Sequence, residues 1–208
     1  AAIKVGEFMA SPDAIDIVIT GKGGHAARPH EAVDPVVIAS HFITAAQTIV
    51  SRSADPTESA VVTIGKIEGG TAHNIIPEKV RMYGTVRTFS NDTKDMIEKR
   101  LHALLKGITD AHGGGYSLEY RRGYPAVINS ETETMNVLET TQELFGNEAA
   151  IEVERPSMAG EDFGFYQEIF PFRFKCRLQL LRNMTSLCCK INIHRPTVIA
   201  VWNAFNIS

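Results

Sequence analysis

Two hydrophobic periodicities alternate along the first 124 residues, and their order constrains the fold more than any other feature. Segment 13–20 alternates apolar and polar side chains, as a strand with one buried face does. The next segment, up to about Ser51, has apolar residues at helical spacing after the start signal Asp34-Pro35. Its apolar stripe consists of Ile38, Phe42, Ala45, Ala46 and Ile49.

The same two patterns then repeat. Segments 60–67 and 79–88 are predicted strands, and Ser90-Asn91-Asp92 can cap a second helix that the glycines at 113–115 end. Residues 116–124 alternate as a fourth strand. The order β-α-β-β-α-β predicts an α+β, ferredoxin-like (split βαβ) domain over residues 11–124, with a four-stranded antiparallel sheet and two helices on one face.

From Pro125 the pattern changes. Ser130 and Glu133 form a predicted capping box for a helix to Phe145, and 150–154 is a predicted short strand. A piece of this length buries little core by itself. We therefore expect residues 1–10 and 125–208 to be a partial segment of a larger α/β domain.

Composition excludes several classes of partner. The chain has 208 residues, 44% of them hydrophobic and 22% charged, with a formal net charge of -3, which argues against disorder and against a general nucleic-acid-binding surface. No apolar run approaches the ~20 residues of a membrane helix, and the first residues lack the layout of a secretory signal. We expect no nucleic-acid or membrane partner and a cytoplasmic location.

The segment 172–208 is atypical. No Asp or Glu follows Glu168, and all three cysteines of the chain lie in this tail without any zinc-binding spacing, so we interpret them as free thiols. The abrupt change suggests divergent or frame-shifted sequence. Translation of the source gene in all three frames would test this hypothesis.

A glycine-rich loop at 21–30, GKGGHAARPH, places two histidines between the first strand and the first helix. Its glycines allow the backbone to approach a ligand closely, and Pro29 stiffens the exit. The loop therefore presents an imidazole, from His25 above all, to a ligand. The alternative is a simple turn whose histidines, including His30, are only solvated.

Three other segments complete a recognisable set: GGTAHNIIPE at 69–78, GTVR at 84–87 and PSMAGEDF at 156–163. With the histidine loop, and in this order, they resemble the zinc-dependent amidohydrolases and metallopeptidases of the aminoacylase and hippurate hydrolase type. The resemblance covers about residues 1–171. It implies that 11–124 is a lid and dimerisation domain and that 1–10 and 125–208 belong to a partial catalytic domain.

The resemblance also implies roles for single residues. His25 would act in trans, in the partner subunit's active site, and stabilise the oxyanion of the tetrahedral intermediate. Asn74 would contact the substrate, and the guanidinium of Arg87 would bind the carboxylate of an N-acyl amino acid. Glu161 would support the substrate site. The alternatives are a turn-forming Asn74 and a solvated Arg87 on the sheet face.

The metal ligands of this family lie mostly in a part of the catalytic domain that precedes the residues present here. The resemblance implies zinc, or another divalent ion such as Mn or Co, in the intact enzyme and no tight metal binding by this chain alone. A metal-bound water with a pKa of ~7 is the nucleophile of such reactions. The one ligand expected in this chain is His194, although its surroundings lack the family's acidic residues.

Two functions remain open at this point. The first is a fragment of a metal-dependent amidohydrolase that cleaves N-acyl amino acids as a homodimer and is inactive as this chain alone. The second is a non-catalytic ferredoxin-like module for dimerisation or small-molecule binding. Turnover of an acyl amino acid with stoichiometric zinc would favour the first, and a stable dimer with neither would favour the second.

Overall fold

A computed structural model describes residues 2–169 of the chain. These residues form two compact units: unit 2 comprises Ala10–Ala126 with Met158–Gly160, and unit 1 comprises the other described residues. The atypical segment 172–208, with His194 and the cysteines, lies outside the described residues. Among the residues described, no helix is both long enough and apolar enough to cross a membrane.

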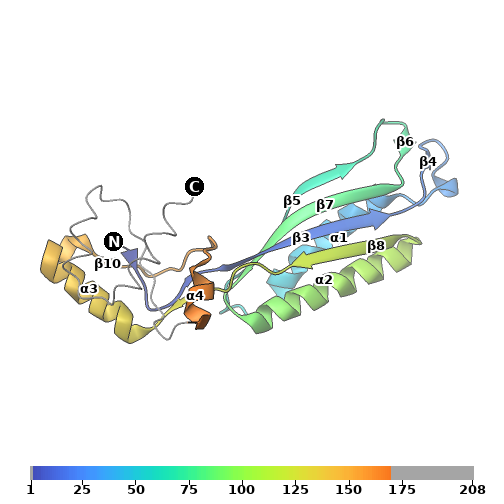
Figure 1. Ribbon diagram of the computed structural model, residues 1–208. Coiled ribbons are helices and arrows are strands. Elements are labelled where there is room, and N and C mark those ends of the chain that lie inside the picture. Colours follow the sequence, from blue (N-terminus) through green and yellow to red (C-terminus); the bar gives the residue numbers. More distant parts are fainter. Residues whose placement is uncertain (1, 170–208) are drawn as a thin grey trace. The chain divides into compact units, whose positions relative to one another are not determined.

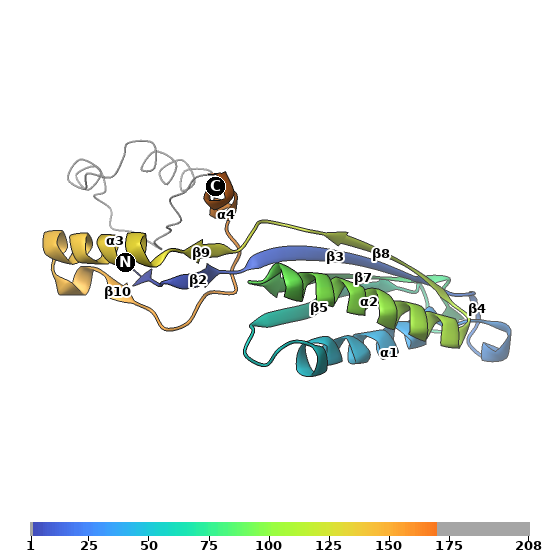
Figure 2. The ribbon, with the colours of Figure 1, turned by 90° about the horizontal axis from the view of Figure 1, so that it is seen from below.

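Unit 2 is built on a four-stranded antiparallel sheet with the strand order β5-β7-β3-β8 (Figure 1). Its strands are β3 (Ser11–Thr20), β5 (Ala60–Gly69), β7 (Lys79–Thr88) and β8 (Gly115–Arg121). The helices α1 (Pro35–Thr48) and α2 (Asn91–His112) cover one face of the sheet (Figure 2). The element order β-α-β-β-α-β and the antiparallel sheet with two helices agree with the sequence prediction.

The fourth strand is shorter than the predicted segment 116–124. It ends at Arg121 because the backbone N–H of Gly123 donates to the side chain of Asp13, at 2.9 Å, instead of continuing the sheet ladder. A side-chain acceptor that competes for a backbone donor is a signal that strand periodicity does not contain.

A single hydrophobic core lies between the sheet and the two helices. The central strand contributes Ile15, Ile17 and Ile19, each at most 1% exposed, as their alternation predicted. Phe42 of α1 and Leu101 of α2 pack into the same cluster and are fully buried. Burial of each such side chain contributes about 1.5–3 kcal/mol, so this cluster is the main source of stability in unit 2.

The helix boundaries follow the capping signals in the sequence. The Asp34 carboxylate accepts the N–H of Val36 at 2.8 Å, and the Ser90 hydroxyl accepts the N–H of Thr93 at 3.4 Å. Gly113 ends α2 with φ of 72°, a left-handed conformation that favours glycine. Beyond Thr48, α1 continues into one turn of π-helix, η2 (Ile49–Ser53).

Unit 1 combines short strand pairs with one longer helix. In it, β1 (Ala2–Ile3) pairs in parallel with β10 (Ile151–Glu152), and β2 (Gly6–Met9) pairs antiparallel with β9 (Val127–Asn129). The helical elements are α3 (Glu131–Phe145), η3 (Asn147–Ala149) and α4 (Phe163–Ile169). A small core contains Phe8, Met9, Val127 and Phe163.

The predicted capping box of α3 has a different geometry. The hydroxyl of Ser130 donates to the carboxylate of Glu133 and caps no backbone N–H. The helix nevertheless begins at Glu131, as the signal predicted. The two side chains satisfy each other, so the first-turn N–H groups gain nothing from them.

Paired charges occupy the face of the sheet that the helices leave uncovered. Both Nε and Nη2 of Arg81 bind the carboxylate of Asp16, at 2.9 and 2.5 Å. Two cations contact the ring of Tyr83: the Arg81 guanidinium carbon lies 4.9 Å and the Lys66 Nζ atom 5.2 Å from the ring centroid. The hydrogen bonds from Arg81 lower the pKa of Asp16 below its ordinary value.

This lowered pKa predicts how stability depends on pH. The contribution of ionised Asp16 is fully present above the pKa of an unfolded aspartate, 3.8, and is lost as the pH falls through the lower folded value. Wild type should therefore exceed Asp16→Asn in free energy of unfolding at neutral pH, and the difference should shrink at about pH 3 and below. Urea unfolding at both pH values measures this; an equal difference at both would contradict it.

Candidate functional site

The histidine loop and the Asn74 loop are joined at one end of unit 2, called the tip here. Strand β4 (Gly24–His25) pairs with β6 (Ile75–Ile76), so that His25 lies opposite Ile75 (Figure 1). The N–H of Ala26 donates to the carbonyl oxygen of Asn74 at 3.0 Å. The tip therefore brings two of the predicted site residues, His25 and Asn74, together, and both are exposed.

Close backbone contacts hold the histidine loop in place. Lys22 and Val33 exchange two backbone hydrogen bonds of 2.9 Å each. A Cβ atom on Gly21 would lie 2.2 Å from the carbonyl oxygen of Val33, so only glycine fits there. These contacts fix the two ends of the loop, so the loop presents its side chains from a restrained backbone.

A local hydrogen bond determines the tautomer of His25. Its Nδ1 atom accepts the backbone N–H of Ala27 at 3.1 Å. The proton of the neutral ring must then lie on Nε2, which makes Nε2–H a donor for a ligand. His30 differs, because its Nε2 lies 3.7 Å from the Glu31 carboxylate within the exposed turn η1 (Pro29–Glu31).

Arg87 lies at the opposite end of the sheet, called the base here. On β7 it is opposite Pro12 of β3 and Val61 of β5. The strand advances eight residues from Lys79, at the tip, to Arg87, which corresponds to roughly 26 Å. Arg87 is half-buried and has no acidic partner among the described residues. One chain therefore does not bring Arg87 and His25 together.

Met158–Gly160, the MAG part of the fourth motif, lies at the base as well. A Cβ atom on Gly160 would lie 2.4 Å from Cγ of Pro12, so the segment passes directly over that ring. Met158 and Val61 line the same hollow. Pro12 and Val61 are also the residues that pair with Arg87 on the two neighbouring strands. Glu161 belongs to unit 1, just before α4.

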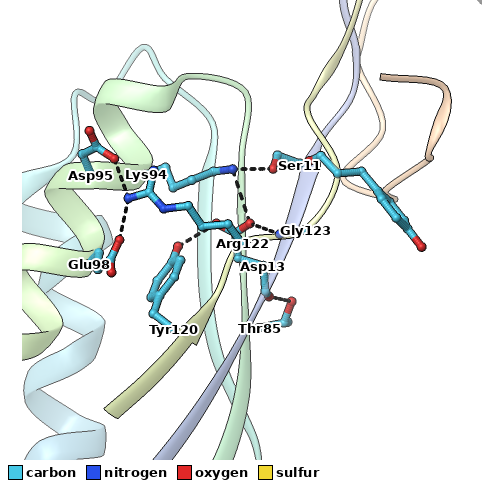
Figure 3. Close-up of polar contacts among 10 residues, drawn as sticks. Ser11, Asp13, Thr85, Lys94, Asp95, Glu98, Tyr120, Arg122 and Gly123 are labelled. Atoms are coloured by element: carbon cyan, nitrogen blue, oxygen red, sulfur yellow. Dashed lines mark hydrogen bonds and ion pairs between the residues drawn. The ribbon is translucent and has the colours of Figure 1, made fainter. Parts of the chain in front are cut away.

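A buried polar network holds the base together (Figure 3). Lys94 of α2 is 5% exposed; its Nζ lies 3.3 Å from Oδ1 of Asp13 and donates to Oγ of Ser11 at 2.8 Å. Asp13 also accepts the hydroxyl of Tyr120 at 2.7 Å and the N–H of Gly123 at 2.9 Å. Burial, with the hydrogen bond to Asp13, raises the pKa of Tyr120 and keeps it protonated.

Sequence reasoning missed this network. Asp13 alternates in phase with Ile15, Ile17 and Ile19 along the strand. The pattern therefore predicts that its carboxylate faces the helices. An inward-facing carboxylate needs a buried cation or several donors. The inward-facing Asp13 could therefore have predicted a buried cation, Lys94, on the helix that covers the sheet.

The described residues do not fit a metal centre. Within residues 2–169, no group of three or more His, Cys, Asp or Glu side chains could hold a metal ion. The predicted ligand His194 lies outside this range. We therefore derive no step through a metal from these residues.

Comparison with known proteins decides the family. Residues 14–112 match the family model described as a peptidase dimerisation domain. The N-acetyldiaminopimelate deacetylase of Brevibacillus brevis is 42% identical over 170 residues. This chain belongs to the M20 family of peptidases and amidohydrolases. The resemblance to amidohydrolases and metallopeptidases of the aminoacylase and hippurate hydrolase type is thus confirmed at the level of the family.

Further M20 relatives agree with this assignment. The hippurate hydrolase of Campylobacter jejuni is 38% identical over 181 residues. A crystal structure of a dinuclear metal binding peptidase from the M20 family, from Bacillus subtilis, has a TM-score of 0.63 at 30% identity and covers 82% of this chain and 41% of that chain. The matches to the deacetylase and the hippurate hydrolase cover 82% and 87% of this chain but only 45% and 46% of those relatives. The chain thus spans less than half the length of these curated relatives.

The buried network at the base generates a stability prediction. Lys94→Met removes the cation and leaves the Asp13 carboxylate buried without it, which should lower the free energy of unfolding by about 3–5 kcal/mol. Lys99→Met, on the exposed side of α2, should change it by less than about 0.5 kcal/mol. Urea unfolding of the two variants tests this, and similar losses in both would show that the network is not a special source of stability.

Proposed function

We propose that this chain is the lid and dimerisation domain, with a distal piece of the catalytic domain, of a metal-dependent amidohydrolase that cleaves the amide bond of N-acyl amino acids. The observation that carries this proposal is the distribution of the motif residues. His25 and Asn74 are at the tip of one sheet and Arg87 is at its base, roughly 26 Å along the strand. A small substrate that contacts all three therefore needs two subunits.

The substrate class follows from the chemistry of these side chains. A guanidinium such as that of Arg87, which has no acidic partner within residues 2–169, suits the free carboxylate of an N-acyl amino acid. An Nε2–H donor, as in His25, suits the carbonyl oxygen on which amide hydrolysis develops negative charge. The names of the relatives, N-acetyldiaminopimelate deacetylase and hippurate hydrolase, refer to substrates of this class.

Asn74, Glu161 and a divalent metal ion complete the proposed site. Asn74 can donate to and accept from the substrate amide, and Glu161 supports the substrate site. Zinc, or another divalent ion, would supply an activated water in the complete enzyme. The described residues contain no group of three or more candidate ligands, so they cannot supply the whole set, and His194 is the candidate outside them within this chain.

The β5 edge of the sheet is the proposed dimer interface. Helix α1, which packs beside β5, contains no Asp, Glu, Lys or Arg, whereas α2, beside β8, is rich in them. Val36, Val37 and Ile67 are between 43% and 55% exposed on α1 and β5. The match to a peptidase dimerisation domain ends at residue 112, before β8 begins. Apolar exposure and absent charge are features of interface cores.

Pairing of two β5 edges across a twofold axis has a direct consequence. Twofold-related strands run antiparallel, so the base of one sheet lies beside the tip of the other. The tip loops with His25 and Asn74 would then approach the partner's Arg87. Each active site would combine the base of one subunit with the tip of the other.

Mixed dimers of the complete enzyme test this arrangement. Neither His25→Ala nor Arg87→Ala homodimers should turn over an N-acyl amino acid, with losses of roughly 100-fold or more. A heterodimer of the two variants has one intact site when the sites are shared, so it should recover about half of the wild-type rate. If both residues act within one chain, or if the protein is a non-catalytic module, no activity returns.

The interface itself can be tested on the 208-residue chain. Val37→Asp places a charge in the proposed β5–α1 interface and should convert a dimer into a monomer at about 10 μM in sedimentation equilibrium. Ala103→Asp, on the exposed side of α2, is the control and should remain dimeric. Loss of the dimer in the control alone would place the interface at the β8 edge.

A further inference from the structure

A hollow of about 790 Å³ in unit 2 is lined by none of the residues to which the proposed reaction assigns a role. It lies where η2, the loop that follows it and the first residues of β5 meet Met158. Its volume is within the range of ~300–1,000 Å³ that small-molecule sites occupy. The hollow is open to solvent, and its charged lining residues Arg52, Asp55 and Glu58 are all exposed. Most of its lining is apolar: Val50, Ala54, Pro56, Ala60, Val61 and Met158.

Charges of both signs also line this hollow. Arg52 contributes a guanidinium, and Asp55 and Glu58 contribute carboxylates. Arg52 forms no hydrogen bond and no ion pair with any described residue, so it is not paired with either of these acids. Each of these three charged groups is available to pair with a group of opposite charge on a ligand in the hollow.

Hydrogen bonds orient the two carboxylates without using all of their oxygen atoms. Oδ1 of Asp55 accepts the N–H and the hydroxyl of Thr57 at 2.8 and 2.6 Å, and Oε2 of Glu58 accepts the hydroxyl of Thr93. The second oxygen of each carboxylate accepts no hydrogen bond from the described residues. The hydrogen bonds from Thr57 also lower the pKa of Asp55, so it is ionised at neutral pH.

We propose that the hollow binds a free α-amino acid with an apolar side chain. The ligand's carboxylate pairs with Arg52, its ammonium group with Asp55 and Glu58, and its side chain lies against Val61 and Met158. A ligand with only a negative charge would face the two acids, and one with only a positive charge would face the guanidinium. Only a zwitterion satisfies both sets. This inference does not rest on the proposed hydrolysis or on the roles of His25 and Arg87.

Calorimetric titration of the 208-residue chain with three related probes tests the proposal. L-leucine carries both charges, N-acetyl-L-leucine lacks the ammonium group, and L-leucinamide lacks the carboxylate. We expect leucine to bind at least about tenfold more tightly than either blocked compound. Arg52→Gln should weaken leucine binding by about tenfold or more, and Asp55→Asn should weaken it as well.

Two further variants make the result specific. Arg100→Gln removes an exposed arginine of α2 outside the hollow and should leave leucine binding unchanged. The inference is overturned if leucine does not bind, if it binds no better than the blocked compounds, or if Arg52→Gln behaves like Arg100→Gln. It is also overturned if Arg87→Gln abolishes binding while Arg52→Gln does not, because the ligand would then occupy the Arg87 site.

Discussion

The ten-residue pairing of β3 with β7 is the constraint on which the rest of this structure depends. It runs without interruption from Ser11–Thr88 at the base to Thr20–Lys79 at the tip. Since a strand advances about 3.3 Å per residue, this ladder separates the two ends by more than the length of a small substrate. The ladder also carries the inward-facing isoleucines of the core, so its register cannot slip without exposing them.

That separation gives the two ends different chemistry. The tip consists of two loops joined by a short strand pair, and it offers an imidazole donor and an amide from restrained but exposed backbone. The base is a packed region in which Pro12 lies against Gly160, and Arg87 lies between Pro12 and Val61. The exposed donors of the tip suit a site that a second protein surface completes. The base, in contrast, can hold a ligand against residues that packing keeps in place.

The polar network around Lys94 explains how the base keeps its geometry. A buried ion pair contributes little net stability compared with apolar packing, because desolvation of both charges offsets their attraction. Here the Asp13 carboxylate also receives the Tyr120 hydroxyl and the Gly123 N–H, so its acceptors are well occupied. These bonds join the start of β3, the end of β8 and α2, and β3 is the strand that pairs with β7 at Arg87.

The sequence by itself determined the elements and the family. Strand alternation, the helical stripe of α1, the Asp34 and Ser90 caps and the Gly113 stop depend on residues close together in the chain. The four motifs were sufficient for the resemblance to amidohydrolases of the aminoacylase and hippurate hydrolase type. Tertiary structure alone decided which motifs meet, where β8 ends, how Ser130 is used, and that Lys94 is buried. These features depend on contacts such as Lys94–Ser11 and Gly123–Asp13, which join residues 83 and 110 positions apart. Such contacts exist only after the sheet register and the helix packing are set, and local periodicity does not encode them.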